Sequence, residues 1–253
     1  MLKRMILLGA LGLGALGVVA NAEESAAFVG VNYQVSMIQN QTKMVNENGL
    51  QKPLIKFPPY AGAGVEVGYK QFLGKKKWFG MRYYGFFDYA HNRFGVMKKG
   101  IPVGESGFIY NSFSFGGNTL TERESYQGQY YINLFTYGVG LDTLWNFVNK
   151  ENMVFGFVVG IQLAGDSWAT SISKEIASYA KHHSNSSYSP ANFQFLWKFG
   201  VRTHIAKHNS LELGIKVPTI THQLFSLTNE KGDTLQANIR RVYAFQISYL
   251  RDF

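Results

Sequence analysis

Apolar and polar residues alternate along most of this chain with a period of two. In the first clear run, apolar side chains occupy the odd-numbered positions from Ala27 to Met37, and Gly30, Asn32 and Gln34 fill gaps between them. Successive side chains of a β-strand point to opposite faces, so this alternation predicts a strand with one apolar face. The pattern recurs and predicts eight strands, at 27–37, 61–70, 79–89, 131–147, 153–164, 193–204, 211–217 and 240–253.

The connections between these strands alternate between short and long. A transmembrane antiparallel up-and-down β-barrel with eight strands has this layout, with short periplasmic turns and long extracellular loops. A soluble sandwich or a lipocalin-like barrel would also alternate. The polar face favours the membrane barrel because its many glycines suit the crowded lumen of a narrow barrel. The short turns lie at 73–77, 148–152 and 205–209, and the long connections at 39–59, 90–130, 166–191 and 218–237.

The amino terminus has the three regions of a secretory signal peptide. Basic Lys3 and Arg4 precede an apolar run and a small-residue cleavage site that ends at Ala22. The run is shorter than the ~20 residues that a membrane-spanning helix needs. We therefore expect residues 1–22 to be a signal peptide and residues 23–253 to form an outer-membrane β-barrel that crosses the membrane with strands.

The last predicted strand ends the chain on an aromatic residue. Counting back in twos from Phe253, one face carries Tyr249, Ile247 and Phe245. A terminal phenylalanine on such a strand resembles the signal that the barrel-assembly machinery reads in bacterial outer-membrane proteins, although Arg251 stands at a position that is usually apolar there. We expect these four apolar residues to form an assembly signal.

Composition limits the chemistry that the chain can perform. It contains no cysteine, which excludes a disulfide, a thiolate nucleophile and a thiolate zinc site. Removing the signal peptide takes away two basic residues, so the net charge falls from +9 to 23 minus 16, or +7. This basic balance agrees with contact to the anionic phosphates of lipopolysaccharide. The lysine run at 75–77 is interpreted as a solvated turn, and no nucleic-acid partner is expected.

Three blocks of the sequence resemble a known family. They are GMRYYGFFDY at 80–89, YGVGLDTLWNF at 137–147 and the ending from Arg240 to Phe253, and they look like blocks of the Helicobacter outer-membrane protein family. The chain is similar to the smaller members, which lack the large extracellular adhesin domain and its cysteines. Because the family contains adhesins, porins and members without an assigned activity, the resemblance implies location and architecture more directly than function.

Charged side chains occupy the predicted inner face of the barrel. An eight-stranded barrel has a lumen only wide enough to be filled by side chains, and unpaired buried charges are costly. We therefore expect four acidic and five basic residues to form a paired network that plugs the barrel. A narrow porin-like channel for small solutes is the alternative. The network residues are Glu66, Lys70, Arg82, Asp88, Asp142, Lys198, Arg202, Glu212 and Lys216.

A lipid A-modifying enzyme is the second alternative, since some eight-stranded outer-membrane barrels modify lipid A with serine, histidine and carboxylate side chains. His91, His182 and His183 fall in or beside predicted extracellular loops, and several serines follow the histidine pair. Loop serines and histidines are common without catalysis, and no spacing here fixes a triad or a metal site. We predict no catalytic residue, no metal ligand and no cofactor.

The expected product is a monomeric outer-membrane protein with a structural or adhesion role. Its long loops would contact a host or another surface. The longest, at 90–130, carries aromatic residues that suit either such contact or folding back over the barrel mouth. Part of 171–181 has helical spacing in Ile172, Ile176 and Tyr179, which predicts a short helix in the third long loop. The other expected partners are outer-membrane lipid, lipopolysaccharide and the barrel-assembly machinery.

Overall fold

The computed structural model describes most of the chain from Glu23 onward. The predicted signal peptide, residues 1–22, lies outside the described residues, as does much of the longest predicted loop. The described residues are 23–46, 49–50, 54–98, 101–103, 128–150, 153–171, 173–182, 185–205, 208–228 and 232–253.

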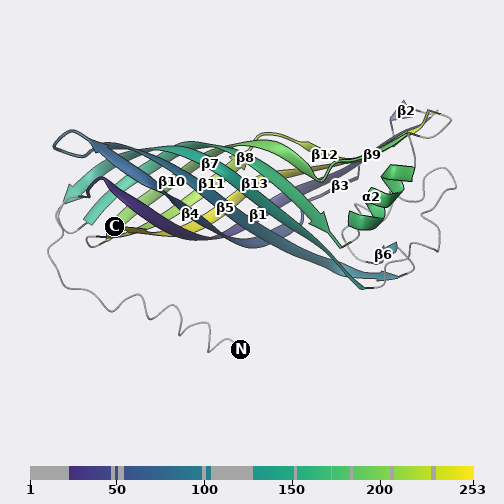
Figure 1. Ribbon diagram of the computed structural model, residues 1–253, viewed down its shortest axis with the longest axis horizontal. Coiled ribbons are helices and arrows are strands. Elements are labelled where there is room, and N and C mark those ends of the chain that lie inside the picture. The colour runs from purple at the N-terminus through teal and green to yellow at the C-terminus, as the bar shows by residue number, and fades with distance from the viewer. Residues whose placement is uncertain are drawn as a thin grey trace.

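Eight long antiparallel strands close into a barrel, as predicted (Figure 1). Each pairs with the next long strand along the chain, and the last returns to the first, so that Phe28 lies opposite Asp252. Closure pairs the two outer edges of the sheet, which a β-sheet requires in lipid. The strands are β1 (Ala26–Asn46), β4 (Pro59–Leu73), β5 (Phe79–Lys98), β7 (Gly128–Lys150), β8 (Met153–Thr170), β10 (Ala191–Ile205), β11 (Asn209–Pro218) and β13 (Thr234–Asp252).

The outer face of the barrel is apolar, and the charged side chains lie on the inner face together with a small apolar cluster. Val65, Leu141 and Phe157 point outward, with 51%, 40% and 51% of their surface exposed. Asp142, the sequence neighbour of Leu141, points inward and is completely buried. A protein in water would bury its apolar face, so the inverted distribution is that of a barrel whose outer face contacts lipid. The alternation predicted from the sequence is confirmed.

Strands continue into the segments predicted as long loops, which corrects the predicted strand ends. β1 runs to Asn46 and β5 to Lys98, while β7 begins at Gly128 and β13 at Thr234. Shorter elements complete this extension at the end of the molecule opposite the carboxy terminus (Figure 1). We call them, with the adjoining strand ends, the cap. These elements are β2 (Gly49–Leu50), β3 (Leu54–Lys56), β6 (Ile101–Val103), α2 (Ser173–His182), β9 (Ser186–Tyr188) and β12 (His222–Thr228).

The cap has an apolar core, whereas the membrane part of the barrel buries a smaller apolar cluster among its charged side chains. Trp168, Ile176, Leu224 and Leu235 are buried together in one cluster of apolar side chains. The cluster lies inside the cap because apolar burial stabilises a part of the protein that is surrounded by water. α2, which contributes Ile176, confirms the short helix predicted within 171–181. Across the described ranges, no helix is long and apolar enough to cross a membrane.

Candidate functional site

The nine charged residues predicted to face inward all lie inside the barrel. Each is at most 3% exposed. They come from five strands, β4, β5, β7, β10 and β11, whose inner faces converge on the barrel axis. Charges that are far apart in the sequence therefore meet. Together with residues that the sequence interpretation missed, they form a central group, a single pair nearer the cap and a cluster near the short turns.

Arg82 joins the carboxylates of the central group. Its Nη2 donates to Asp142 Oδ2 at 2.5 Å, and its Nη1 donates to Glu212 Oε1 at 2.7 Å. Nη2 also donates to Glu212 Oε2 at 3.0 Å, so the contact with Glu212 is bidentate. Charge-assisted bidentate pairs are among the strongest hydrogen bonds in proteins. The planar guanidinium thus fixes the positions of both carboxylates.

Lys198 adds a second positive charge to the central group. Its Nζ lies 3.4 Å from Asp142 and 3.7 Å from Glu66. The same Nζ lies 5.0 Å from the centre of the Tyr84 ring. Tyr84 donates to Asp142 Oδ1 at 3.0 Å and accepts from Gln162 Nε2 at 2.9 Å. Large side chains in mutual contact therefore occupy the lumen at this level.

Glycines in the barrel wall make room for the central group. A Cβ atom at Gly160 would lie 2.0 Å from Asp142 Oδ1, and one at Gly140 would lie 2.4 Å from the Tyr84 ring. Both distances are far shorter than a normal contact. Glycine at these positions lets Asp142 and Tyr84 lie directly against the backbone of the neighbouring strand.

Replacing Gly160 with alanine should destabilise the barrel by about 1–3 kcal/mol, the usual cost of overpacking. The new methyl group would displace Asp142 and weaken its contact with Arg82. The midpoint of urea unfolding, followed by heat-modifiable gel mobility, measures the loss. Gly85→Ala is the matched control, because a Cβ at Gly85 would meet its nearest neighbour at 3.9 Å. Equal midpoints for the two variants would contradict the crowding described for the lumen.

A separate ion pair lies nearer the cap. Lys216 Nζ donates to Asp88 Oδ2 at 2.6 Å and lies 5.0 Å from the centre of the Phe86 ring. Asp88 Oδ1 also accepts a hydrogen bond from Asn32 Nδ2 at 3.2 Å. The side chains of this pair, whose charges neutralise each other, therefore occupy the inside of the barrel between the central group and the cap.

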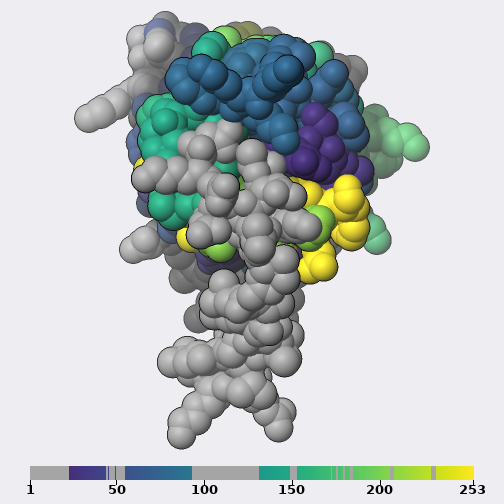
Figure 2. All heavy atoms as spheres, turned by 90° about the vertical axis from the view of Figure 1, so that its left-hand side faces the viewer, coloured from purple at the N-terminus to yellow at the C-terminus, as the bar shows by residue number. Residues whose placement is uncertain are grey.

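A cluster of charges closes the end of the barrel that carries the short turns. Figure 2 shows this end, where the purple start of β1 lies beside the yellow end of β13. Lys70 Nζ lies 2.5 Å from Glu23 Oε1 and 2.5 Å from Asp252 Oδ2. Arg202 also pairs with Glu23. The sequence interpretation missed Glu23 because it precedes the first strand, whereas Asp252 could have been found from its place on the polar face of the last strand.

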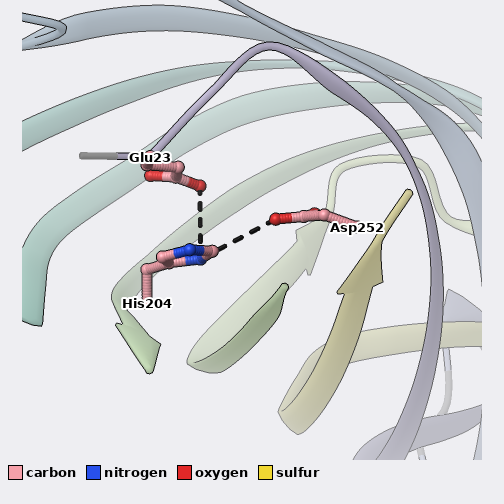
Figure 3. A group of neighbouring side chains, drawn as sticks. All are labelled: Glu23, His204 and Asp252. Carbon is pink, nitrogen blue, oxygen red and sulfur yellow. Dashed lines mark ion pairs between the residues drawn. The ribbon is translucent and has the colours of Figure 1, made fainter. Parts of the chain in front are cut away.

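Glu23, His204 and Asp252 form a group of residue types that can bind metals (Figure 3). Their ligand atoms lie within 4.8 Å of one another. His204 Nδ1 is 3.8 Å from Glu23 Oε1 and 3.7 Å from Asp252 Oδ2. The ammonium group of Lys70 lies 2.5 Å from an oxygen of each carboxylate and neutralises their charge. A metal ion would have to displace this ammonium group. We assign no metal to this group.

The same group lacks the geometry of a catalytic triad. His204 Nδ1 contacts Ser210 Oγ at 2.9 Å and also faces the two carboxylates. A triad needs the serine on one ring nitrogen and the acid on the other. The cluster is therefore described better as a set of ion pairs that ties the start of β1 to the barrel wall.

The loop histidines considered for catalysis contact amide and carbonyl groups. His91 Nδ1 lies 2.7 Å from Asn133 Oδ1. His182 Nδ1 lies 2.7 Å from the backbone carbonyl oxygen of Ser178, within α2. His183 lies outside the described residues. Each described contact anchors a histidine to its own part of the cap.

Ion pairs should keep Glu23 anchored over a wide pH range. Burial raises the pKa of Glu23, but Arg202 and Lys70 lower it more, so this pKa lies well below the usual 4.5. A lowered pKa gives stability that is fully present above the unfolded-state pKa and is lost only as the pH falls through the folded-state pKa. Hydrogen exchange near Glu23, corrected for intrinsic rate, should show equal protection at neutral pH and at about pH 5.

Glu23→Gln should lower that protection at both pH values, because one carboxylate of the cluster is lost. Glu24→Gln is the matched control, since the Glu24 side chain is 72% exposed. Protection that is lost between neutral pH and about pH 5 in the parent protein would contradict the ion-paired anchor.

The residues of the predicted assembly signal lie on the outer face of β13. Phe245, Ile247, Tyr249 and Phe253 are all exposed there. The backbone N–H of Phe253 donates to the carbonyl of Ala27 at 2.9 Å, which pairs the last residue with the first strand. Their recognition by the assembly machinery stays a prediction.

Comparisons with known proteins find one family match and several similar solved structures. A family model described as Helicobacter outer membrane protein matches residues 64–253. OprG from Pseudomonas aeruginosa is similar with a TM-score of 0.49 and 9% identity, over 91% of this chain and 97% of that one. Ail of Yersinia pestis, the attachment invasion locus protein, has a TM-score of 0.37 and 9% identity over 91% and 99%. A major outer membrane protein from Thermus thermophilus has a TM-score of 0.39 and 12% identity, over 90% of this chain and 100% of that one. None of the curated proteins compared with the chain matches it.

The family match covers most of the chain. It includes all three sequence blocks on which the resemblance was based, at 80–89, 137–147 and 240–253. The closed barrel and its apolar outer face are the structure that such a protein needs in lipid. The chain therefore belongs to the Helicobacter outer membrane protein family and is an integral protein of the bacterial outer membrane.

Proposed function

We propose that the protein is a sealed barrel that holds its cap at the cell surface for contact with a host or another surface. The filled lumen is the observation that carries this proposal. From the short turns to the cap, the inside contains the Glu23 cluster, the group around Arg82, the Lys216–Asp88 pair and the apolar core of the cap. Because side chains occupy each level, a barrel of eight strands has little room for a pathway.

Planar-bilayer recording with the purified protein tests the seal. The proposal predicts no stable single-channel steps at neutral pH, in contrast to a porin-like channel. Stable steps of uniform conductance would replace the proposal with the narrow-channel alternative.

Mass profiles of lipid A from cells with and without the protein test the enzyme alternative. The sealed, surface-contacting barrel predicts that the two profiles are identical.

Exposed lysines on the cap allow a matched test of surface contact. α2 carries Lys174 and Lys181, both exposed, and the β4–β5 turn at the opposite end of the barrel carries exposed Lys75 and Lys76. Cells that express Lys174→Glu with Lys181→Glu should bind anionic host-cell surfaces less than the parent, because charge attraction on the exposed side is lost. Lys75→Glu with Lys76→Glu makes the same charge change in the periplasm and should have no effect. Equal binding by the deletion strain and the parent would refute the contact role.

A further inference from the structure

Arg241 is a buried cation without a partner among the described residues. It lies on β13 with 1% of its surface exposed, and none of its three guanidinium nitrogens has a hydrogen-bond partner. The other buried lysines and arginines of the described chain each form an ion pair, so Arg241 is the exception within that set. These paired residues are Lys70, Arg82, Lys198, Arg202 and Lys216.

A β-bulge turns Arg241 toward the inside of the barrel. Tyr243 lies opposite Met37 of β1, but Arg241 lies opposite Ile38, so Val242 has no counterpart on β1. The extra residue shifts the alternation by one position. Arg241 therefore points inward although simple counting in twos from the carboxy terminus places it on the outer face with Tyr243. Bulges often re-aim side chains beside functional sites.

Other polar side chains without partners lie beside Arg241 on the same two strands. On β1, Gln34, Ser36 and Asn40 are buried, and their polar side-chain atoms have no hydrogen-bond partner in the part of the chain that is described. Ser36 and Asn40 are the diagonal neighbours of Arg241, within reach of a long side chain. Gln34 lies opposite Gln246, whose Oε1 is also unpaired. We call these five residues the Arg241 band.

The band has the chemistry of an anion site. Arginine keeps its positive charge in proteins. Buried water can satisfy amide and hydroxyl groups, but it does not neutralise a charge, and an unpaired buried charge is strongly unfavourable. The planar guanidinium fork matches the two oxygens of a carboxylate or a phosphate. We infer that the Arg241 band binds a small oxyanion of the carboxylate or phosphate class, with Ser36 and Asn40 as further donors.

The location of the band makes the oxyanion a resident ligand. On one side, Lys216 lies opposite Ala244 and belongs to the ion pair with Asp88. On the other side, Ile38 and Ile239 belong to the apolar core of the cap. Shielding from water on both sides strengthens the attraction between the guanidinium and the anion. The oxyanion is therefore taken up as the barrel folds and is retained afterwards.

Asp166 is the internal rival for the charge of Arg241. It is buried on β8 and accepts hydrogen bonds from Thr136 Oγ1 at 2.5 Å and Gln194 Nε2 at 3.5 Å. Within the described chain, no lysine or arginine forms an ion pair with it. A long-range attraction between Asp166 and Arg241 would neutralise both charges without a ligand, and Asp166→Asn separates that arrangement from a bound oxyanion.

Refolding in different salts tests the inference. The protein is unfolded in urea and refolded at one ionic strength in chloride, acetate or phosphate. Native mass spectrometry, with ion chromatography of the unfolded product, then counts the retained anions. We expect one oxyanion per barrel and a midpoint of thermal unfolding several degrees higher than in chloride, because a ligand that binds only the folded state stabilises it. The anion that is retained in larger amount, acetate or phosphate, shows whether the site prefers a carboxylate or a phosphate.

Variants of one strand make the test specific. Arg241→Met removes the charge, so it should retain no oxyanion, and its midpoint should show only the general effect of each salt on folded proteins. Arg251→Gln, on the exposed face of β13, should behave like the parent. If Arg241→Met does not fold, the anion content of the parent decides. A parent protein without oxyanion, and with the same salt dependence as Arg241→Met, would overturn the inference. The same holds if Asp166→Asn lowers the midpoint in the parent but not in Arg241→Met.

Discussion

Replacing Arg82 with glutamine is expected to destabilise the barrel by about 3–5 kcal/mol, the usual cost of removing one partner from a buried ion pair. The loss is large because Arg82 contacts two carboxylates that are themselves buried, Asp142 and Glu212. Lys198 remains close to both, at 3.4 Å and 3.8 Å, but its single ammonium group cannot replace the bidentate fork. Urea unfolding of the purified barrel measures the change.

A second substitution separates lost charge pairing from lost packing. Arg82→Gln combined with Glu212→Gln removes one carboxylate along with the arginine, so the double variant should be more stable than Arg82→Gln alone. Lys75→Gln, in the exposed turn, should leave the midpoint unchanged. A double variant that is less stable than the single one would show that Arg82 contributes mainly by packing.

Replacing Leu224 with alanine is expected to cost the cap about 2–5 kcal/mol, as for other large-to-small changes in a core. Leu224 is buried in the apolar cluster with Ile176 of α2 and Trp168 of β8. The cap should open locally, because its core is separate from the ionic lumen of the membrane part. A protease added to intact cells should therefore cleave the cap faster, while the barrel keeps its heat-modifiable mobility.

Leu213→Ala provides the matched control for the cap variant. Leu213 points outward from β11 and is exposed on the barrel surface. The same loss of side-chain volume should leave the protease sensitivity of the cap unchanged. If Leu224→Ala abolished heat-modifiable mobility, the cap and the membrane part would be one cooperative unit.

Alternation was enough to predict the membrane part of the fold. Lipid outside and side chains inside require one apolar and one polar face, so the odd-numbered residues from Val29 to Val35 and their even-numbered neighbours separate cleanly. The inward charges follow from the same count. Asp142 and Lys198, for example, fall on the polar face of their strands and meet at 3.4 Å in the structure.

The strand segments in the cap were not predicted because their outward-facing residues are polar, whereas those of the membrane part are apolar. On β1, Ile38, Asn40 and Thr42 point inward, whereas Gln39 and Gln41 face outward and are partly exposed. In water the outer face becomes polar, so the sequence of such a strand resembles that of a hydrophilic loop. The outer residues of β1 change from apolar to polar near Gln39, as expected where a barrel strand passes from lipid into water.

The inward positions of Arg241 and Glu23 could not be predicted from the alternation with a period of two. The bulge at Val242 reverses which residues of β13 face inward, and a bulge leaves little trace in a single sequence. Glu23 lies before the first strand, so no periodicity applies to it. Its anchoring depends on Lys70 and Arg202 from distant strands, which only the closed barrel brings together.

Chemical labelling of Ser248→Cys would test most directly whether the lumen is closed to water. Ser248 is buried on β13 opposite Glu212, at the level of the central ion group, and the absence of native cysteine leaves no background. We predict that a water-soluble maleimide does not label this cysteine in the folded protein and labels it fully in urea, whereas Lys75→Cys in the exposed turn reacts in both states. Rapid labelling of folded Ser248→Cys would mean that water fills the barrel, and the sealed-lumen account would be wrong.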